Sequence, residues 1–233
     1  RSGWHRSRRK PGSNGPSAQQ QHAPAKHDAG SLYGALDLGT NNCRLLIATP
    51  TGNGFSVVDA FSRIVRLGEK LQQTGRLSDD AMSRTIDALR VCANKLKWRQ
   101  VTKVRLVATE ACRMAENGPD FIARVRNETG LGLEIIDRET EAGLAAVGAE
   151  PLVDRQAETA LVFDIGGGST EVLWMRRNGS RFDTLAWTSL AAGVVTISEQ
   201  FGGGVDVTPA SFEAMRSYLR PMLQEFAARV SAA

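Results

Sequence analysis

One aspartate-and-glycine pattern occurs twice in this chain, and that repetition limits the fold more than any other feature of the sequence. The segments ALDLGTNNCRLL (35–46) and VFDIGGGSTEVL (162–173) share an aspartate, a glycine turn that follows it, and apolar flanks. The two aspartates, Asp37 and Asp164, lie 127 residues apart, which is much longer than the roughly 20–50-residue period of solenoids and propellers. The sequence therefore predicts two copies of a domain-sized unit.

Each copy begins with three short apolar runs separated by tight polar turns. Turns rich in Gly, Asn and Ser between such runs are typical of antiparallel hairpins. The pattern predicts a three-strand meander in each copy, with the aspartate at the end of a buried strand. The expected strands are Tyr33–Leu38, Cys43–Thr49 and Phe55–Val65 in the first copy and Thr159–Ile165, Glu171–Met175 and Phe182–Ser189 in the second.

Helices are expected after each meander. Apolar residues recur at helical spacing over Leu77–Trp98, which Ser78 can cap. The remaining expected elements are a strand at Val104–Thr109, a helix at Asp120–Glu128, a strand at Leu133–Ile136, and helices at Glu139–Ala149, Gly193–Phe201 and Thr208–Val230.

This alternation predicts an α/β fold made of two related domains. We expect a tail at 1–30, a first domain at 31–137 and a second at 138–233. The second copy lacks counterparts of the later strands and helices of the first. We therefore expect the second domain to be incomplete at its C-terminus.

Positive charge is concentrated in the first thirty residues. They contribute +5 to the formal net charge of +4, so the remaining residues carry −1. The segment is rich in Ser, Gly, Pro and Gln, which is typical of a disordered tail. Two interpretations are open, an arm for anionic partners or a solvated tail. The folded part has no basic excess, and we do not expect it to bind nucleic acid.

The histidines and cysteines exclude several kinds of site. All three histidines, His5, His22 and His27, lie in the tail, which argues against a Ser-His-Asp triad or a His-ligated zinc site. The three cysteines form no CxxC pair, so we expect no disulfide framework and a cytoplasmic location. No run reaches the roughly 18 apolar residues that a membrane span requires.

The glycine turns are candidate phosphate-binding sites. Successive backbone N–H groups in such a turn form an anion-binding concavity, and only small residues let a phosphate approach closely. A plain hairpin turn would use the same residue types, but two such turns after equivalent aspartates favour phosphate binding. Neither turn is a Walker loop or a dinucleotide-binding loop, because there is no GK[ST] and a strand follows 166–169. The candidate residues are Gly39, Thr40, Asn41, Gly166, Gly167, Gly168 and Ser169.

Two carboxylates flank the second turn. Asp164 and Glu171 are seven residues apart across the expected hairpin, so both can face one site. Carboxylate oxygens and phosphate oxygens are ligands that a hard cation such as Mg²⁺ or Mn²⁺ accepts. We expect a metal site here, with Asp37 of the first copy as a further ligand.

Five motifs carry a resemblance to a known family. DLGTNNCR (37–44), VRLGE (65–69), ATEACR (108–113), IIDRETEA (135–142) and DIGGGSTE (164–171) resemble the Ppx/GppA family of exopolyphosphatases and guanosine-pentaphosphate phosphohydrolases. That family belongs to the actin/sugar-kinase/Hsp70 ATPase superfamily. The resemblance implies two ribonuclease-H-like (actin-like) domains with a phosphoanhydride bound in the cleft between them.

The resemblance also implies roles for individual residues. Glu141 matches the base that activates water for attack on a terminal phosphoryl group, and Arg113 matches an arginine that contacts substrate phosphates. Asp164 and Glu171 match magnesium ligands, and the glycine turns match the phosphate turns. The implied substrate is polyphosphate or guanosine pentaphosphate, and the implied assembly is a homodimer. Read without the family, Glu141 is no better a candidate than Glu139.

One position departs from the family pattern. An arginine usually follows two residues after the base, but this chain has Gly143. A non-catalytic polyphosphate or nucleotide sensor therefore stays open beside the hydrolase, and a kinase or ATPase of the same superfamily is a further alternative. The sequence does not separate the two implied substrates.

Overall fold

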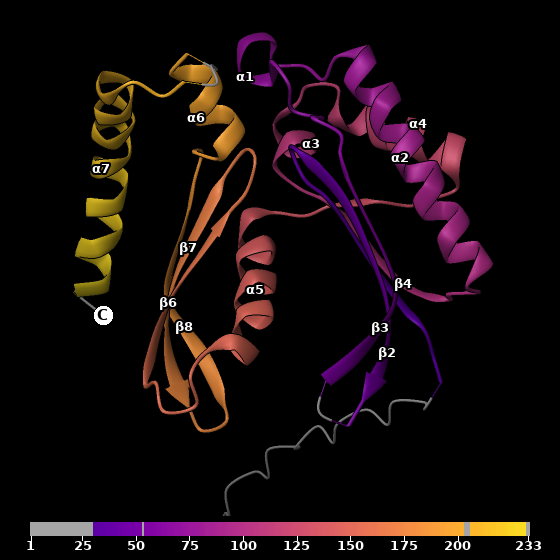
Figure 1. Ribbon diagram of the computed structural model, residues 1–233, viewed down its shortest axis with the longest axis horizontal. Coiled ribbons are helices and arrows are strands. Elements are labelled where there is room, and N and C mark those ends of the chain that lie inside the picture. Colours follow the sequence, from indigo (N-terminus) through magenta and orange to yellow (C-terminus); the bar gives the residue numbers. More distant parts are fainter. Residues whose placement is uncertain (1–29, 53, 203–205, 232–233) are drawn as a thin grey trace, which may run out of the picture.

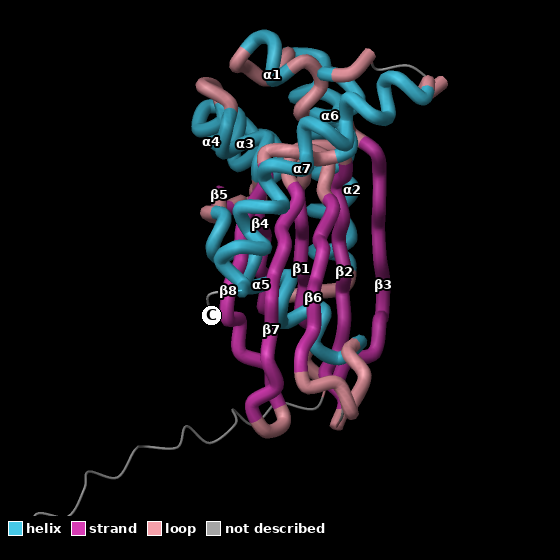
Figure 2. The backbone as a smooth tube through the Cα atoms, turned by 90° about the vertical axis from the view of Figure 1, so that its left-hand side faces the viewer, coloured by secondary structure: helices cyan, strands magenta, loops and turns pink. Residues whose placement is uncertain are grey.

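Two β-sheets stand side by side in the computed structural model, with helix α5 between them (Figure 1). The structure describes residues 30–52, 54–202 and 206–231, so almost all of the predicted tail lies outside the described residues. The two sheets lean away from each other in Figure 1, and α1, α3, α4 and α6 lie toward the end where the sheets come closest (Figures 1 and 2). The predicted α/β class with two related halves is confirmed.

The first sheet has five strands in the order β3-β2-β1-β4-β5. β1, β2 and β3 form the predicted antiparallel meander, and β4 and β5 continue it in parallel to β1. The strands are β1 Tyr33–Leu38, β2 Asn42–Thr51, β3 Gly54–Ile64, β4 Lys103–Ala108 and β5 Glu134–Ile135.

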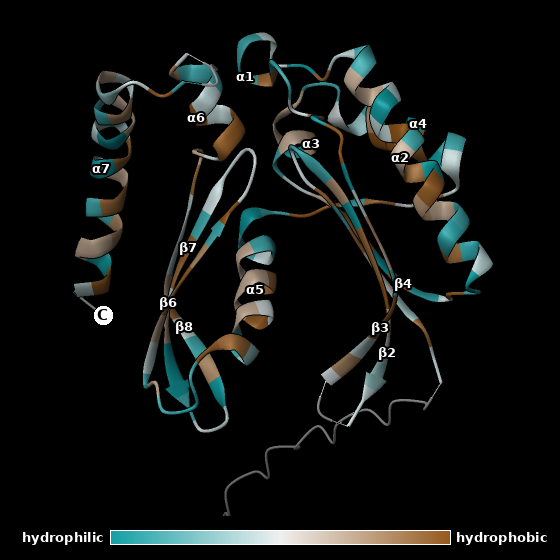
Figure 3. Cartoon of the chain, in the orientation of Figure 1, coloured by the Kyte–Doolittle hydropathy of each residue, from teal (hydrophilic) through white to brown (hydrophobic). Residues whose placement is uncertain are grey.

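Helices cover one face of this sheet and enclose the largest core. α2 begins where the sequence predicts, because the Ser78 hydroxyl accepts a hydrogen bond from the backbone N–H of Ala81 (3.2 Å). Hydrophobic residues recur along α2 among hydrophilic ones (Figure 3), and Ile86 and Leu89 lie in the core beside Phe121 of α4. The helices of this half are α1 Leu71–Thr74, α2 Asp79–Trp98, α3 Glu110–Met114 and α4 Gly118–Thr129.

The second sheet has three antiparallel strands in the order β6-β7-β8. α5 packs on one face through Ala142 and Ala146, which contact Leu173 and Met175. α7 packs on the other face through Phe226. A 3-10 turn at Glu150–Leu152 links α5 to this sheet. The elements are α5 Arg138–Ala149, β6 Thr159–Ile165, β7 Thr170–Asn178, β8 Arg181–Leu190, α6 Val194–Gln200 and α7 Pro209–Ser231.

The duplication extends to details of the sheets. Asp37 pairs with Arg44 across β1 and β2, and Asp164 pairs with Glu171 across β6 and β7. A register shift falls between Ile47 and Ala48 in the first half, and the second half has one between Trp174 and Met175. Each of these positions lies 127 residues from its counterpart. The two meanders are therefore copies in backbone geometry as well as in sequence pattern.

Three features differ from the sequence-based expectation. The strand that ends at Asp164 is not buried: Phe163 and Ile165 of β6 are exposed, and so is Asp164 itself. The short helices α1 and α3 were not predicted, because one turn of helix leaves no repeating apolar pattern to detect.

Among the described residues, no helix has both the length and the apolar character needed to cross a bilayer.

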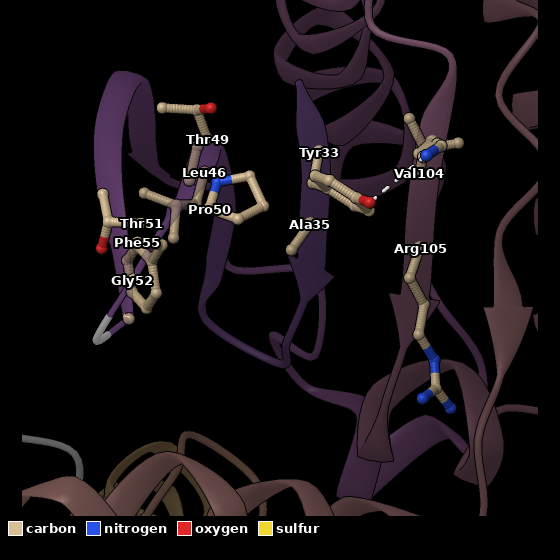
Figure 4. Close-up of a pocket in the computed structure, with 14 residues that line it drawn as sticks. Tyr33, Ala35, Leu46, Thr49, Pro50, Thr51, Gly52, Phe55, Val104 and Arg105 are labelled. Carbon is tan, nitrogen blue, oxygen red and sulfur yellow. Dashed lines mark hydrogen bonds between the residues drawn. The ribbon is translucent and has the colours of Figure 1, made fainter. Parts of the chain in front are cut away.

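A spacious hollow lies on the first sheet. It has a volume of about 800 Å³, and Tyr33, Ala35, Leu46 and Phe55 are among its mainly apolar lining (Figure 4). Leu46 is the counterpart of Leu173, which α5 covers on the second sheet. The hollow therefore lies on the face of the first sheet that corresponds to the α5-covered face of the second sheet. No carboxylate lines it, and it is not the chemical site.

Candidate functional site

A smaller cavity between the two halves collects nearly all the predicted site residues. Its volume is about 160 Å³, and both glycine turns line it. Of its nine other lining residues, seven are polar or charged. The lining residues are Asp37, Gly39, Thr40, Asn41, Asn42, Arg44, Thr109, Glu110, Glu141, Asp164, Ile165, Gly166, Gly167, Gly168, Ser169, Glu171 and Val194.

The two turns have the same hydrogen bonds. The N–H of Gly39 donates to the Asn42 carbonyl (2.9 Å), and the N–H of Gly166 donates to the Ser169 carbonyl at the same distance. These are equivalent positions in the duplication. Each bond closes its turn, so the backbone between the two strands is fixed in the same way in both halves.

A second pair of equivalent bonds orients the peptide groups of the turns. The Thr40 carbonyl accepts from the N–H of Gly68 (3.0 Å), and the Gly167 carbonyl accepts from the N–H of Val195 (2.9 Å). In a planar trans peptide the N–H points opposite to the carbonyl. The next N–H of each turn is therefore directed away from the segment that binds its carbonyl, which leaves it available to an anion.

Glycine is required in the second turn because the two turns touch. A methyl group at Gly168 would lie 2.5 Å from Oγ1 of Thr40, and one at Gly167 would lie 3.0 Å from Cβ of Asn41. No side chain fits at the first distance, because real Cβ contacts are longer. The close approach brings the two predicted phosphate turns together in the lining of one cavity.

The three predicted metal ligands all face this cavity, and their charges repel one another. Burial raises the pKa of Asp37, and the neighbouring Asp164 raises it further, although Arg44 counteracts both. Burial also raises the pKa of Glu171, and the neighbouring Asp164 adds to that shift. Hydrogen bonds from Ser189, whose hydroxyl donates to Oε1 of Glu171 (2.8 Å), and from Ser169 oppose it. A cation between these carboxylates would relieve the repulsion.

The donor set fits magnesium rather than a metal held wholly by protein. In the parts of the chain that are described, no three His, Cys, Asp or Glu side chains converge closely enough to hold an ion by themselves. Mg²⁺ commonly binds one or two carboxylates and completes its shell with water and substrate phosphates. Asp164 and Glu171, paired across one hairpin, are the two carboxylates best placed for that.

Glu141 reaches the cavity from the first turn of α5. Asp137 caps this helix, because Oδ1 accepts from the N–H of Thr140 (2.7 Å). Ala142, the next residue, is buried against the second sheet, which fixes the helix and directs Glu141 into the cavity. Burial raises the pKa of Glu141 to about 7; Arg113 opposes the shift, and Glu171 and Glu110 add to it. Glu139, on the same turn, is exposed.

Arg113 adjoins Glu141 without being a cavity-lining residue itself. Its Nη2 donates to Oε2 of Glu141 (2.9 Å), and its Nη1 donates to the Ile136 carbonyl (2.6 Å). It also binds Glu110 of the same short helix. Both side chains of the Arg113–Glu141 pair are mostly buried. The structure thus brings the predicted base and the predicted phosphate-binding arginine into direct contact.

Sequence reasoning missed three charged residues at the site. Arg44 lines the cavity at the position equivalent to Glu171, and the alignment of the two copies was the signal that could have found it. Glu110 also lines the cavity, and Arg138 binds it. For these two residues no pattern in the sequence indicated a role, because the residues come together only through packing.

The fold and the site define a two-half α/β protein with a cavity lined by two duplicated glycine turns, and comparison with known proteins identifies its family. A sequence model of the Ppx/GppA phosphatase family matches residues 46–233. The chain belongs to the Ppx/GppA phosphatase family.

Solved structures agree with that assignment. A Ppx/GppA family member from Aquifex aeolicus is 30% identical, with a TM-score of 0.66, over 84% of this chain and 62% of that one. An exopolyphosphatase-like protein is 29% identical, with a TM-score of 0.76, over 84% and 61%. An exopolyphosphatase from Cytophaga hutchinsonii shares the fold at 24% identity, with a TM-score of 0.77, over 87% and 64%. The chain thus spans less than two thirds of the length of each of these structures.

Proposed function

We propose that this chain carries the catalytic cleft of a metal-dependent phosphohydrolase. The reaction is release of the terminal phosphate of inorganic polyphosphate, or of the 5′-terminal phosphate of guanosine pentaphosphate. Membership of a phosphatase family and a likeness to an exopolyphosphatase-like structure support this proposal. A carboxylate base also suits residues 31–233, which contain no histidine.

One observation carries the mechanism: Glu141, a mostly buried carboxylate with a pKa of about 7, shares a cavity with the two predicted phosphate turns. A general base works best when its pKa lies near the working pH. Burial has moved the pKa of Glu141 into that range. Only Glu141 of the two glutamates in this helix turn faces the cavity, so it is the group that accepts a proton from attacking water.

The remaining cavity residues position and neutralise the substrate. Backbone N–H groups of the turns 39–42 and 166–169, both of which line the cavity, bind phosphate oxygens. Arg113 and Arg44 supply positive charge where negative charge builds on the transferred phosphoryl group. Water attacks in line with the departing phosphate chain, and the water proton passes to Glu141.

Asp164 and Glu171 would hold Mg²⁺, with Asp37 behind them. Bound there, the ion would neutralise phosphate oxygens and fix their orientation. The protein side chains prepare the site by holding unneutralised carboxylates at one end of the cavity. The assembly as a homodimer and the cytoplasmic location remain predictions from the sequence.

The decisive experiment compares wild type with Glu141→Gln, using Glu139→Gln as the matched control. Phosphate release with Mg²⁺ is measured on long-chain polyphosphate and on guanosine pentaphosphate. We expect Glu141→Gln to lower the rate by at least about 100-fold and Glu139→Gln to leave it within about twofold, because Glu139 is exposed outside the cavity. The ratio of the two wild-type rates assigns the substrate.

Other outcomes would replace the proposal. If both substrates bind without release by wild type, the protein is a sensor, and Gly143 in place of the usual arginine becomes the residue to change. Phosphate transfer from a nucleotide to an acceptor would indicate a kinase. Equal activity in Glu141→Gln and wild type would remove Glu141 from the mechanism.

A further inference from the structure

Glu110 is a buried carboxylate at the centre of an ion-pair cluster that the proposed mechanism does not use. It begins α3, and its side chain is only 8% exposed. One oxygen, Oε2, accepts from Nε of Arg113 (3.1 Å) and also from Nη2 of the same residue. The other, Oε1, accepts from Nη2 of Arg138 (2.9 Å). Both oxygens are therefore committed to arginines.

The position of Glu110 is fixed by the second glycine turn. A methyl group at Gly168 would lie 3.1 Å from Cγ of Glu110, so this side chain packs directly against the turn. Burial opposes ionisation of Glu110, but Arg138 and Arg113 outweigh it and lower its pKa. Glu110 is thus held as a carboxylate between the phosphate turn and two cations.

The contacts of Arg113 show what Glu110 does to it. Its guanidinium donates to Glu110, to the Ile136 carbonyl and to Glu141. Two carboxylates share this one cation. Without Glu110, Glu141 would be the sole carboxylate partner of Arg113 among the contacts described, and a carboxylate paired alone with a cation is a weaker base.

We propose that Glu110 is a positioning residue that keeps Arg113 shared between two carboxylates, so that Glu141 is oriented by Arg113 but not neutralised by it. Arg138 takes part by holding the second oxygen of Glu110. This inference rests on the proposed role of Glu141 as the base. Glu110 belongs to the ATEACR segment, and no pattern in the sequence indicated a role for its side chain.

The sign of the effect follows from the charges around Glu141. The negative charge of Glu110 raises the pKa of Glu141, whereas Arg113 lowers it. Glu110→Gln removes that negative charge and leaves Arg113 to Glu141, so the pKa of Glu141 falls. Arg138→Gln leaves Glu110 bound to Arg113 alone, which draws Arg113 away from Glu141, so the pKa of Glu141 rises. The charged groups that surround Glu141 are Asp37, Arg44, Glu110, Arg113, Arg138, Asp164 and Glu171.

The test measures the titration of Glu141 directly and the rate separately. Carbon-13 NMR of glutamate carboxyls, with the Glu141 signal assigned through Glu141→Gln, follows the midpoint in wild type, Glu110→Gln and Arg138→Gln. The rate of phosphate release from polyphosphate is measured against pH for the same proteins. Glu139→Gln is the control for loss of one carboxylate near the cleft.

We expect opposite shifts in the two variants. The midpoint of Glu141 moves to lower pH in Glu110→Gln and to higher pH in Arg138→Gln, and Glu139→Gln leaves it unchanged. The maximal rate of Glu110→Gln falls by roughly tenfold, with KM for polyphosphate within about twofold. Arg138 is partly exposed, so its variant decides the question even if Glu110→Gln does not fold.

Two results would overturn the proposal. One is an unchanged Glu141 midpoint in Arg138→Gln and, where it folds, in Glu110→Gln. The other is a shift of the same sign in both variants. The NMR measurement does not depend on turnover. Opposite shifts of the Glu141 midpoint in a protein that releases no phosphate would therefore support the arrangement of Glu110, Arg113 and Glu141 and would refute only the proposed hydrolysis.

Discussion

β1 and β6 occupy the same place in the two copies, yet their surroundings differ. In β1, Leu36 and Leu38 are 1% and 0% exposed, whereas their counterparts in β6, Phe163 and Ile165, are 51% and 63% exposed. β1 has β4 beside it and a helical layer over that face, while β6 is at the edge of its three-stranded sheet. The burial of a strand is therefore set by its neighbours, even when its own pattern is repeated.

The chemistry of the two hairpins differs as well. In the first, Asp37 is paired in register with a cation, Arg44; in the second, Asp164 is paired with another carboxylate, Glu171. The same backbone thus carries a charge-balanced pair in one half and an unbalanced pair in the other. The two hairpins thus share a predicted phosphate turn and differ in charge at one position, where the first has Arg44 and the second has Glu171.

The largest expected effect tests the difference in burial. Leu36→Ala removes a fully buried side chain and should lower the free energy of unfolding by about 3 kcal/mol. Phe163→Ala should lower it by about 1 kcal/mol or less in this chain, because half of that side chain is already in solvent. Urea unfolding of both variants measures the two values. Equal losses would mean that β6 is covered in solution.

The difference in charge predicts two separate kinetic defects. Glu171→Gln should raise the Mg²⁺ concentration for half-maximal rate by about 100-fold, with a smaller change in KM. Arg44→Gln should instead raise KM for polyphosphate by about tenfold, with little change in the Mg²⁺ requirement. Titrations of each ligand at saturating levels of the other measure both. If the two variants shift the same parameter, the hairpins do not have separate roles.

The third prediction, with a smaller expected effect, concerns how the rate of phosphate release depends on pH. Burial raises the pKa of Glu141 to about 7, and only the ionised carboxylate can accept a proton from water. The rate should therefore rise with pH, reach half its plateau near pH 7, and fall about tenfold for each unit below that. Initial rates between pH 5 and 9 test this. A profile that is flat from pH 5 to 8 would contradict it.

The smallest effect concerns two glycines in contrasting surroundings. Gly143 is in α5 with open space around it, so Gly143→Ala should stabilise the protein by about 0.5–1 kcal/mol. Gly34 of β1 is the opposite case, since a methyl group there would lie 2.7 Å from Cδ2 of Leu96; Gly34→Ala should destabilise. Its counterpart in β6 is Leu161, which is exposed. Thermal unfolding of both variants checks the signs, and a gain at Gly34 would mean that α2 packs loosely on β1.

Much of the fold could be predicted because its signals are local. The meanders follow from alternating apolar runs and polar turns, and α2 follows from helical spacing with a capping serine at Ser78. The same applies to the start of α7 at Pro209, after Thr208. The duplication was visible because both copies keep an aspartate before a glycine turn.

The rest depended on contacts between distant segments. The exposure of β6 could not be predicted, since its apolar residues look like those of a buried strand. The choice of Glu141 over Glu139 needed the resemblance, and its physical reason is the contact with Arg113, 28 residues earlier in the chain. Arg138 and Glu110 meet over the same separation, which periodicity does not detect.

The pair of Arg113 and Glu141 has a mechanical consequence. Arg113 belongs to the first half, where it is tied to the end of β5 through the Ile136 carbonyl, whereas Glu141 is on α5, which rests on the second sheet. The chain between the two supports is only the short stretch around Asp137, the cap of α5. The Arg113–Glu141 contact therefore joins the two halves beside the point where the chain passes from one to the other. A movement that parted the end of β5 from α5 would break this contact.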